Sequence, residues 1–436
     1  MSTDIKDCTG LLLGAGFSFE LGMPLGPTLT KEIFEILAPE RLRRLDEIWA
    51  QGGRELSEHV ERLCKFMTLP HVRTPNYESI LGHLESEDWF LRAQADRGTH
   101  TLKALFTDTI NNILIGRHIM LAGFTMEMLR FYDGLLGLAQ ANSPLWIFTL
   151  NHDVMIELIA ARLSLPVSGG FSDEKLHIQL APAPGGESRH LSAEVIRNAH
   201  LKSRMLNFFR RGTIGINLLK IHGALDIFTF NEGNDVLRIL PHGDGADGIL
   251  EALYNLNSQM PPTPPPRIPG GHFATDTDGN DLFLQASLVS GAHKFDARHP
   301  QVLPMDYLQI FETSLLHLDT LICIGYSFGD IHINLLIRGW LELSRDKRLV
   351  IVGPGSDVPA AFLHLADRVE CKDMNATAFL QSCAALPLTP DELQIQEKGR
   401  SVISKINSHP PDSAAWAFWN QPQLWDHSVN GDSTER

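Results

Sequence analysis

Four apolar, β-favouring runs in this chain end abruptly at small or polar residues. With their ends they read TGLLLGAGFSFE from residue 9, LWIFTLNHD from 145, LLKIHGALD from 218 and LICIGYSFGDIHIN from 321. A strand in a parallel sheet is apolar along its length because both faces are covered, and the loop at its carboxyl end supplies the groups of a site. The four ends, spread over more than 300 residues, therefore predict an α/β fold with a parallel sheet and one shared cleft.

A long helical segment interrupts this pattern early in the chain. Between about residues 28 and 140, apolar residues recur at three- and four-residue spacing, which is typical of helices. This length far exceeds a simple βα crossover, so we expect a helical insertion or subdomain within a catalytic domain of residues 1–390. Residues 391–436 are expected to be a partly irregular extension, ending in a tail with Trp416, Trp419 and Trp425.

The second half of the chain alternates between expected strands and helices. Strands are expected at 11–13, 145–150, 216–221, 321–325 and 349–353, helices at 154–163, 305–316 and 331–343, and a last strand and helix within 368–386. Two segments rich in Gly and Pro, 166–215 and 255–282, are expected to be irregular, the second as a long loop.

Composition excludes several classes of protein. The formal net charge of −15 argues against direct, surface-wide binding of nucleic acid. The five cysteines form no CxxC pair, so we expect no zinc or other metal site and no disulfide framework, which suits the cytoplasm. The N-terminus has no secretory pattern and no apolar run is long enough for a bilayer, so no membrane association is expected.

The first turn, Gly14-Ala15-Gly16-Phe17-Ser18, is a candidate phosphate-binding loop. A glycine turn that opens a helix can bring backbone N–H groups close to a pyrophosphate. The full GxGxxG fingerprint and the Walker pattern are both missing. A tight structural turn is therefore an equal alternative.

The second and third ends carry the candidate catalytic residues. Asn151 and Asp153 follow a buried strand directly, where polar groups are costly unless they have partners. On local grounds, a cap on the next helix is the favoured interpretation of Asp153. His222, followed by a glycine that leaves room for a ligand, suits a general base near neutral pH, although most single histidines are structural.

The fourth end, Gly325 to Asp330, also opens a helix. Ser327 and nearby N–H groups can hold a ribose or phosphate, whereas Asp330 can simply be an N-cap. Residues 353–356 repeat this design more weakly, where an adenine end would lie.

Taken in order, these segments resemble the sirtuin family, in particular its bacterial branch in antiphage defence. GAGFS at 14–18, TLNHD at 149–153, IHG at 221–223 and GYSFGD at 325–330 are similar to the cofactor loop, the TxNxD segment, the catalytic HG and the late GxS loop of that family. Asn76-Tyr77-Glu78 resembles a segment of the defence branch. The resemblance implies a sirtuin-type, Rossmann-like sheet that binds NAD.

Two differences from the sirtuin deacylases also bear on the expected activity. Sirtuin deacylases have two CxxC pairs that bind zinc, and this chain has none, while its helical segment is long. Both are typical of members that hydrolyse NAD. The resemblance implies an NAD⁺ glycohydrolase with Asn151, Asp153 and His222 as catalytic residues. The cofactor-binding set would be Gly14, Ala15, Gly16, Phe17, Ser18, Gly325, Ser327 and Asp330.

An NAD-consuming effector of antiphage defence must be regulated. We expect a homo-oligomer, and the resemblance suggests a HerA-type hexameric ATPase as one partner. Two other classes stay open: an NAD-dependent protein deacylase or ADP-ribosyltransferase, and a non-catalytic NAD or ADP-ribose-binding regulatory subunit.

Overall fold

The computed structural model describes residues 8–51, 56–68, 76–90, 97–180, 189–241, 243, 245–259, 271–288, 295, 303–384 and 387–408. The tail with Trp416, Trp419 and Trp425 lies outside these residues.

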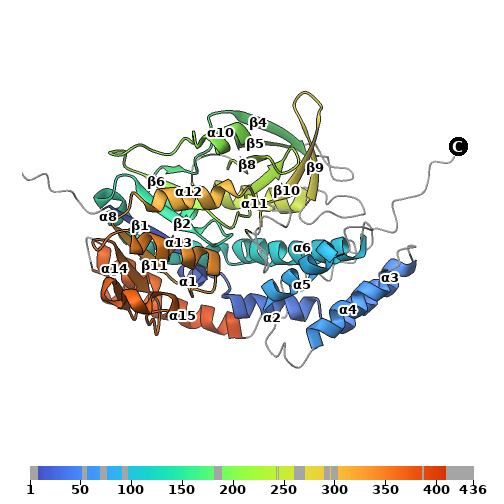
Figure 1. Ribbon diagram of the computed structural model, residues 1–436, viewed down its shortest axis with the longest axis horizontal. Coiled ribbons are helices and arrows are strands. Elements are labelled where there is room, and N and C mark those ends of the chain that lie inside the picture. The colour runs from blue at the N-terminus through green and yellow to red at the C-terminus, as the bar shows by residue number, and fades with distance from the viewer. Residues whose placement is uncertain are drawn as a thin grey trace, which may run out of the picture.

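A seven-stranded sheet forms the centre of the fold (Figure 1). Its order is β13-β12-β11-β1-β2-β6-β3, and every pair is parallel. The strands are β1 Thr9–Leu13, β2 Leu145–Thr149, β3 Val167–Ser168, β6 Ile216–Lys220, β11 Thr320–Ile324, β12 Arg348–Val352 and β13 Val369–Lys372. The apolar residues Leu11, Leu12 and Leu13 of the central strand are completely buried. The predicted parallel α/β sheet is confirmed.

The strand order places a crevice at the carboxyl end of β1. The chain passes from β1 to β2 and β6 on one side, and later builds β11, β12 and β13 on the other. At such a reversal, neighbouring loops turn in opposite directions and leave room for a ligand.

The predicted large helical part is also confirmed. It lies between β1 and β2 and comprises α1 Ala15–Phe19, α2 Gly26–Ile36, α3 Pro39–Gln51, α4 Ser57–Thr68, α5 Tyr77–Phe90, α6 Arg97–Met120, α7 Ala122–Met128, η1 Leu129–Tyr132 and α8 Gly134–Ala141. Helices α3 and α4 reach the end of the molecule opposite α14 Ala376–Cys383 (Figure 1). A buried ion pair between Arg117 of α6 and Glu32 of α2 joins two of these helices.

Six antiparallel strands form a closed barrel that the sequence did not predict. They are β4 Lys175–Leu180, β5 Arg189–Ile196, β7 Ile227–Phe230, β8 Asp235–Ile239, β9 Gly271–Asp276 and β10 Asp281–Ala286, in the order β10-β7-β8-β5-β4-β9.

The barrel corrects two expectations. Residues 166–215 are not simply irregular, because they contain β3, β4, β5 and α10 Asn198–Ser203. Residues 255–282 are not one long loop, because they contain the end of α11 Ala246–Gln259, all of β9 and the start of β10. Short strands that pair with distant partners carry a weak local signal, and the glycines and prolines between them hid it.

The remaining helices match the later predictions to within a few residues. They are α9 Met155–Arg162, α12 Asp306–Leu315, α13 Ile331–Glu342 and α14. A 3-10 segment that was not predicted, η2 Ala360–Arg368, precedes β13. The last described helix, α15 Pro390–Ser408, is tied to the start of the chain because Arg400 donates to Glu20 Oε1 at 2.6 Å. Within the described residues, no helix has the length and apolar character needed to cross a membrane.

Candidate active site

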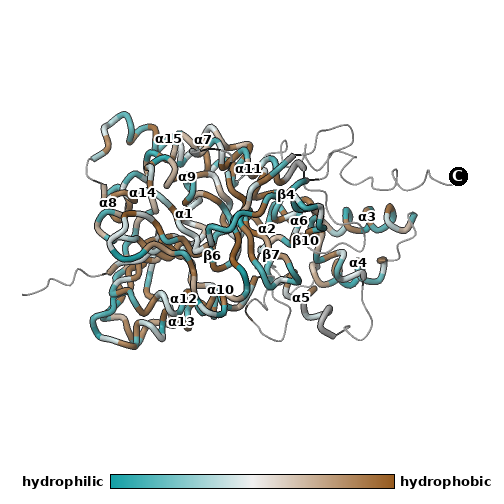
Figure 2. The backbone as a smooth tube through the Cα atoms, turned by 90° about the horizontal axis from the view of Figure 1, so that it is seen from above, coloured by the Kyte–Doolittle hydropathy of each residue, from teal (hydrophilic) through white to brown (hydrophobic). Residues whose placement is uncertain are grey.

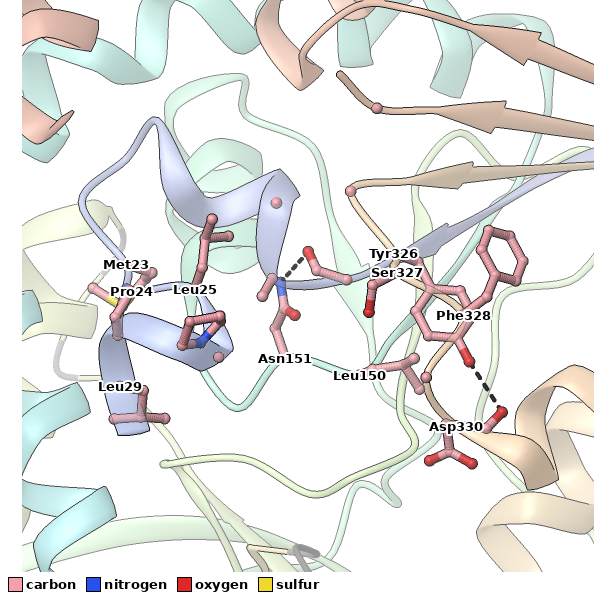
Figure 3. Close-up of a pocket in the computed structure, with 18 of the residues that line it drawn as sticks. Met23, Pro24, Leu25, Leu29, Leu150, Asn151, Tyr326, Ser327, Phe328 and Asp330 are labelled. Atoms are coloured by element: carbon pink, nitrogen blue, oxygen red, sulfur yellow. Dashed lines mark hydrogen bonds between the residues drawn. The ribbon is translucent and has the colours of Figure 1, made fainter. Parts of the chain in front are cut away.

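A cavity of about 760 Å³ lies at the carboxyl ends of β1, β2, β11 and β12 (Figure 3). The loops after these strands line one part of it, and Met23 to Leu29, at the start of α2, line the part facing them. His222, after β6, Tyr77 and Glu78, from α5, and Leu114, from α6, also line it. The helical part therefore contributes directly to the cavity.

The two glycine loops pack backbone against backbone. Gly16 N–H donates to Gly325 O at 3.0 Å, and Gly14 N–H donates to Ile324 O at 3.0 Å. A Cβ at Gly14 would lie 2.6 Å from Gly325 O, and a Cβ at Gly325 would lie 2.4 Å from Gly16 C. Gly325 also has a φ of +65°. These glycines are needed for the contact between the loops after β1 and β11, whatever they bind.

We expect Gly325→Ala to lower the free energy of unfolding by about 2 kcal/mol, because alanine meets both the left-handed conformation and the backbone of Gly16. Gly355→Ala is the matched control: Gly355 has a φ of +64°, but nothing lies within 4 Å of its added Cβ. Urea unfolding should show a clearly larger loss for Gly325→Ala. Equal losses would mean that the contact between the loops adds nothing to stability.

Asn151 connects the loop after β2 to the loop after β1. Its Nδ2 donates to Gly14 O at 2.9 Å and to Ser18 Oγ at 3.1 Å. With the amide nitrogen engaged in this way, Oδ1 is the atom that can accept a hydrogen bond from a ligand or a water molecule. Figure 3 shows the Asn151 side chain between the start of α2 and Leu150.

Asp153 is buried next to this amide. Its Oδ1 accepts from Met155 N–H at 3.1 Å, one residue after the N-cap Val154. Burial raises the pKa of Asp153, although hydrogen bonds from Ser18 and Met155 and the charge of Lys220 partly oppose the shift. The ionised carboxylate is therefore unfavourable in the folded chain until a positive charge comes near.

Two buried side chains hold the backbone around Asp153. Lys220 Nζ donates to Asp153 O at 3.0 Å. His118 of α6 accepts from Val154 N–H at 3.4 Å, and burial lowers the pKa of His118 to about 3, so its ring is neutral. Sequence reasoning missed both: Lys220 lies within an apolar run and His118 in a helix far from the motifs.

His222 lies against Asp330, which comes from the loop after β11. Nε2 of His222 is 3.2 Å from Oδ2 of Asp330, and both side chains are buried. Oδ1 of Asp330 accepts from His332 N–H at 3.0 Å and Ile333 N–H at 3.3 Å, so it is also the N-cap of α13. Asp330 therefore caps α13 through Oδ1 and contacts His222 through Oδ2. An imidazole oriented by a carboxylate is a common arrangement for a general base.

The structure brings most of the predicted site residues to this one cavity. Its lining includes Gly14, Ala15, Gly16, Asn151, Asp153, His222, Gly325, Ser327 and Asp330. Ser18 lies behind it as the partner of Asn151, and Phe17 is completely buried, with its ring 5.2 Å from that of Tyr132. Phe17 therefore belongs to the core beneath the loop.

The other lining residues could not be recognised as site residues from the sequence alone. The segment from Met23 to Leu29 reads as a helix start, and Tyr326 and Phe328 read as loop aromatics. Tyr326 shapes the loop, since its hydroxyl donates to Asp330 O at 3.2 Å (Figure 3). Among the described residues, no group of three or more His, Cys, Asp or Glu side chains is arranged to hold a metal ion.

Comparison with known proteins gives similarity at the level of structure alone. No protein-family model matches the chain, and no curated protein matches its sequence. Among solved structures, a Sir2 homologue mutant bound to ADP-ribose is similar, with 12% identity and a TM-score of 0.34 over 91% of this chain and 93% of that chain. Sir2 bound to an inhibitor, 2'-O-acetyl-ADP-ribose and a deacetylated peptide has 12% identity and a TM-score of 0.31, over 86% and 91%. Values this low carry no argument about activity.

Proposed function

We propose that this chain is a sirtuin-like NAD⁺ glycohydrolase, which cleaves NAD⁺ to ADP-ribose and nicotinamide. The main support for this proposal is that Asn151, Asp153 and His222 line one cavity together with the two packed glycine loops. This cavity lies where the strand order of the sheet reverses. Dinucleotides bind at such crevices in open parallel sheets, and a volume of about 760 Å³ lies within the usual range of small-molecule sites.

The lining divides into a part suited to phosphate and a part suited to the reacting sugar. We place the pyrophosphate at Gly14, Ala15 and Gly16, the adenosine side at Ser327 and residues 353–356, and the nicotinamide ribose at Asn151, Asp153 and His222. This orientation puts the positive pyridinium ring near Asp153. Its charge offsets the cost of the buried carboxylate, so NAD⁺ stabilises the ionised form of Asp153.

Hydrolysis then needs little acid catalysis, because nicotinamide leaves as a neutral molecule. The bond from C1′ to the pyridinium nitrogen breaks and the nitrogen keeps the electron pair. The carboxylate of Asp153 stabilises the positive charge that develops on the sugar. Water adds to C1′ and gives its proton to His222, which Asp330 orients, while Asn151 Oδ1 accepts a hydrogen bond from the water or a ribose hydroxyl.

We further propose that this activity serves antiphage defence by depleting cytoplasmic NAD⁺. The proposal rests on the motif resemblance and on the domain organisation inferred from sequence, a catalytic domain of residues 1–390 with an extension to 436. Because depletion is toxic, the active form would be a regulated homo-oligomer, with a HerA-type ATPase as one candidate partner.

The direct test incubates the purified full-length chain with NAD⁺, with and without an acetylated peptide, and separates the products by chromatography. We expect nicotinamide and ADP-ribose in equal amounts, unchanged by the peptide. An O-acyl-ADP-ribose product would instead support a deacylase. Binding of NAD⁺ without turnover would support a regulatory subunit and contradict hydrolysis.

A further inference from the structure

A second cavity, of about 570 Å³, lies between α9, α11 and strand β8 of the barrel, and none of its lining residues belongs to the first cavity. Helices α9 and α11 pack against each other (Figure 2). The walls are mainly apolar and include Ala160, Leu165, Ile239, Ile249, Leu253 and Leu256. The volume is that of a site for a small organic molecule.

Charged groups lie at one side of this apolar space. Glu157, Asp226 and Arg238 line it, and Arg238 forms an ion pair with Glu194. Lys220 Nζ lies 2.7 Å from Glu157 Oε1 and 3.4 Å from Asp226 Oδ1. One ammonium group is thus shared by two carboxylates, which leaves an excess of one negative charge. Both carboxylate oxygens of Glu157 are buried, whereas the side chain of Asp226 is partly exposed.

The direction of the pKa shift of Glu157 agrees with this charge count. Burial raises the pKa of Glu157, and the attraction of Lys220 opposes the shift without cancelling it. A second positive charge at this place would stabilise the carboxylate, because two carboxylates in an apolar setting need two counter-charges.

We propose that this cavity is a second ligand site, which binds an amphipathic ammonium compound. The hydrocarbon part of the ligand packs against the apolar walls, and its ammonium group donates to the carboxylate of Asp226, which lines the cavity and is partly exposed. A ligand anion is disfavoured by the carboxylates of Glu157 and Asp226, and a neutral analogue gains the apolar contacts alone.

Lys220 connects this site to the first cavity. The same Nζ that pairs with Glu157 and Asp226 donates to the backbone oxygen of Asp153. A ligand ammonium beside Asp226 therefore lies next to Lys220, which holds the loop between β2 and α9.

Hexylamine and 1-hexanol form a matched pair of probes, with the same chain and with or without the charge. Calorimetry on the full-length chain at pH 7 should show saturable binding of one hexylammonium per chain, at least ten-fold tighter than hexanol. Equal affinity for the two, or no saturable binding of hexylamine, would overturn the proposal. This measurement uses no NAD⁺, so its outcome is independent of the proposed hydrolase activity.

Two variants and one mapping experiment locate the bound probe. Asp226→Asn removes one carboxylate, and Ala161→Trp fills the cavity from a half-buried position. Each should weaken hexylamine binding at least ten-fold, whereas Asp173→Asn, at an exposed position, should not. Hydrogen exchange of the wild-type chain should slow within 154–162 and 246–256 when hexylamine is bound. Slowing confined to other segments, or unchanged affinity in both cavity variants, would contradict this site.

Discussion

His222→Ala should reduce the rate of NAD⁺ cleavage about 10³-fold while the chain remains folded. The imidazole is the candidate base for the attacking water, and general base catalysis typically contributes a factor of this order. Its backbone position, after β6, depends on the sheet and not on the ring. Nicotinamide release at saturating NAD⁺ measures the effect, and His177→Ala, an exposed histidine of the barrel strand β4, is the control. Turnover at the wild-type rate would exclude His222 as the base.

Two further variants test the residues that act beside the proposed base, His222. Asn151→Ala should also abolish turnover, because it removes Oδ1 from the cavity and the link from Nδ2 to Gly14 and Ser18. Asp330→Asn keeps an oxygen that can cap α13 but removes the charge beside His222. It should lower kcat without unfolding the chain. Loss of helix stability with full kcat would show that Asp330 acts as a cap alone.

The central sheet was predictable because its strands are locally conspicuous. Leu11–Leu13 and Leu145–Thr149 are apolar runs that stop at glycine or polar residues, and each such stop marks a carboxyl end at the same edge. The closeness of residues 14–16, 151–153, 222 and 325–330 in the cavity then follows from topology. The carboxyl ends of neighbouring parallel strands always lie at the same edge of the sheet.

The barrel and the buried ion pairs of Lys220 were not predictable, because they have no conspicuous local pattern in the sequence. Strand β4 pairs with β9, about 100 residues later in the chain, so neither strand indicates its partner locally. Lys220 reads as one polar residue in an apolar run. Its partners Glu157 and Asp226 come from a helix and a loop, and only the fold brings them together.

Asp153→Asn should give two opposite effects: a large loss of activity and a gain in stability. Replacing the carboxylate removes the negative charge proposed to stabilise the developing cation on the ribose, and we expect at least a ~10³-fold loss of kcat. The carboxamide can still accept from Met155 N–H and contact Ser18, so the local geometry has the same partners.

The gain in stability follows from the direction of the pKa shift. Because burial raises the pKa of Asp153 in the folded chain, its contribution to stability is most favourable below the pKa of an unfolded aspartate and is lost as pH rises through the raised value. At neutral pH the variant avoids the cost of burying the ionised group, so its free energy of unfolding should exceed that of the wild type.

The gain in stability of Asp153→Asn should depend on pH. Below the pKa of an unfolded aspartate the wild-type carboxyl is protonated in both states, so the advantage of the variant should shrink there. Urea unfolding at neutral and acidic pH measures the difference, with Asp173→Asn as an exposed control that should change little at either pH. A variant less stable than the wild type at neutral pH would mean that the ionised Asp153 is already compensated within the fold, and the argument that it is held for a cationic substrate would fail.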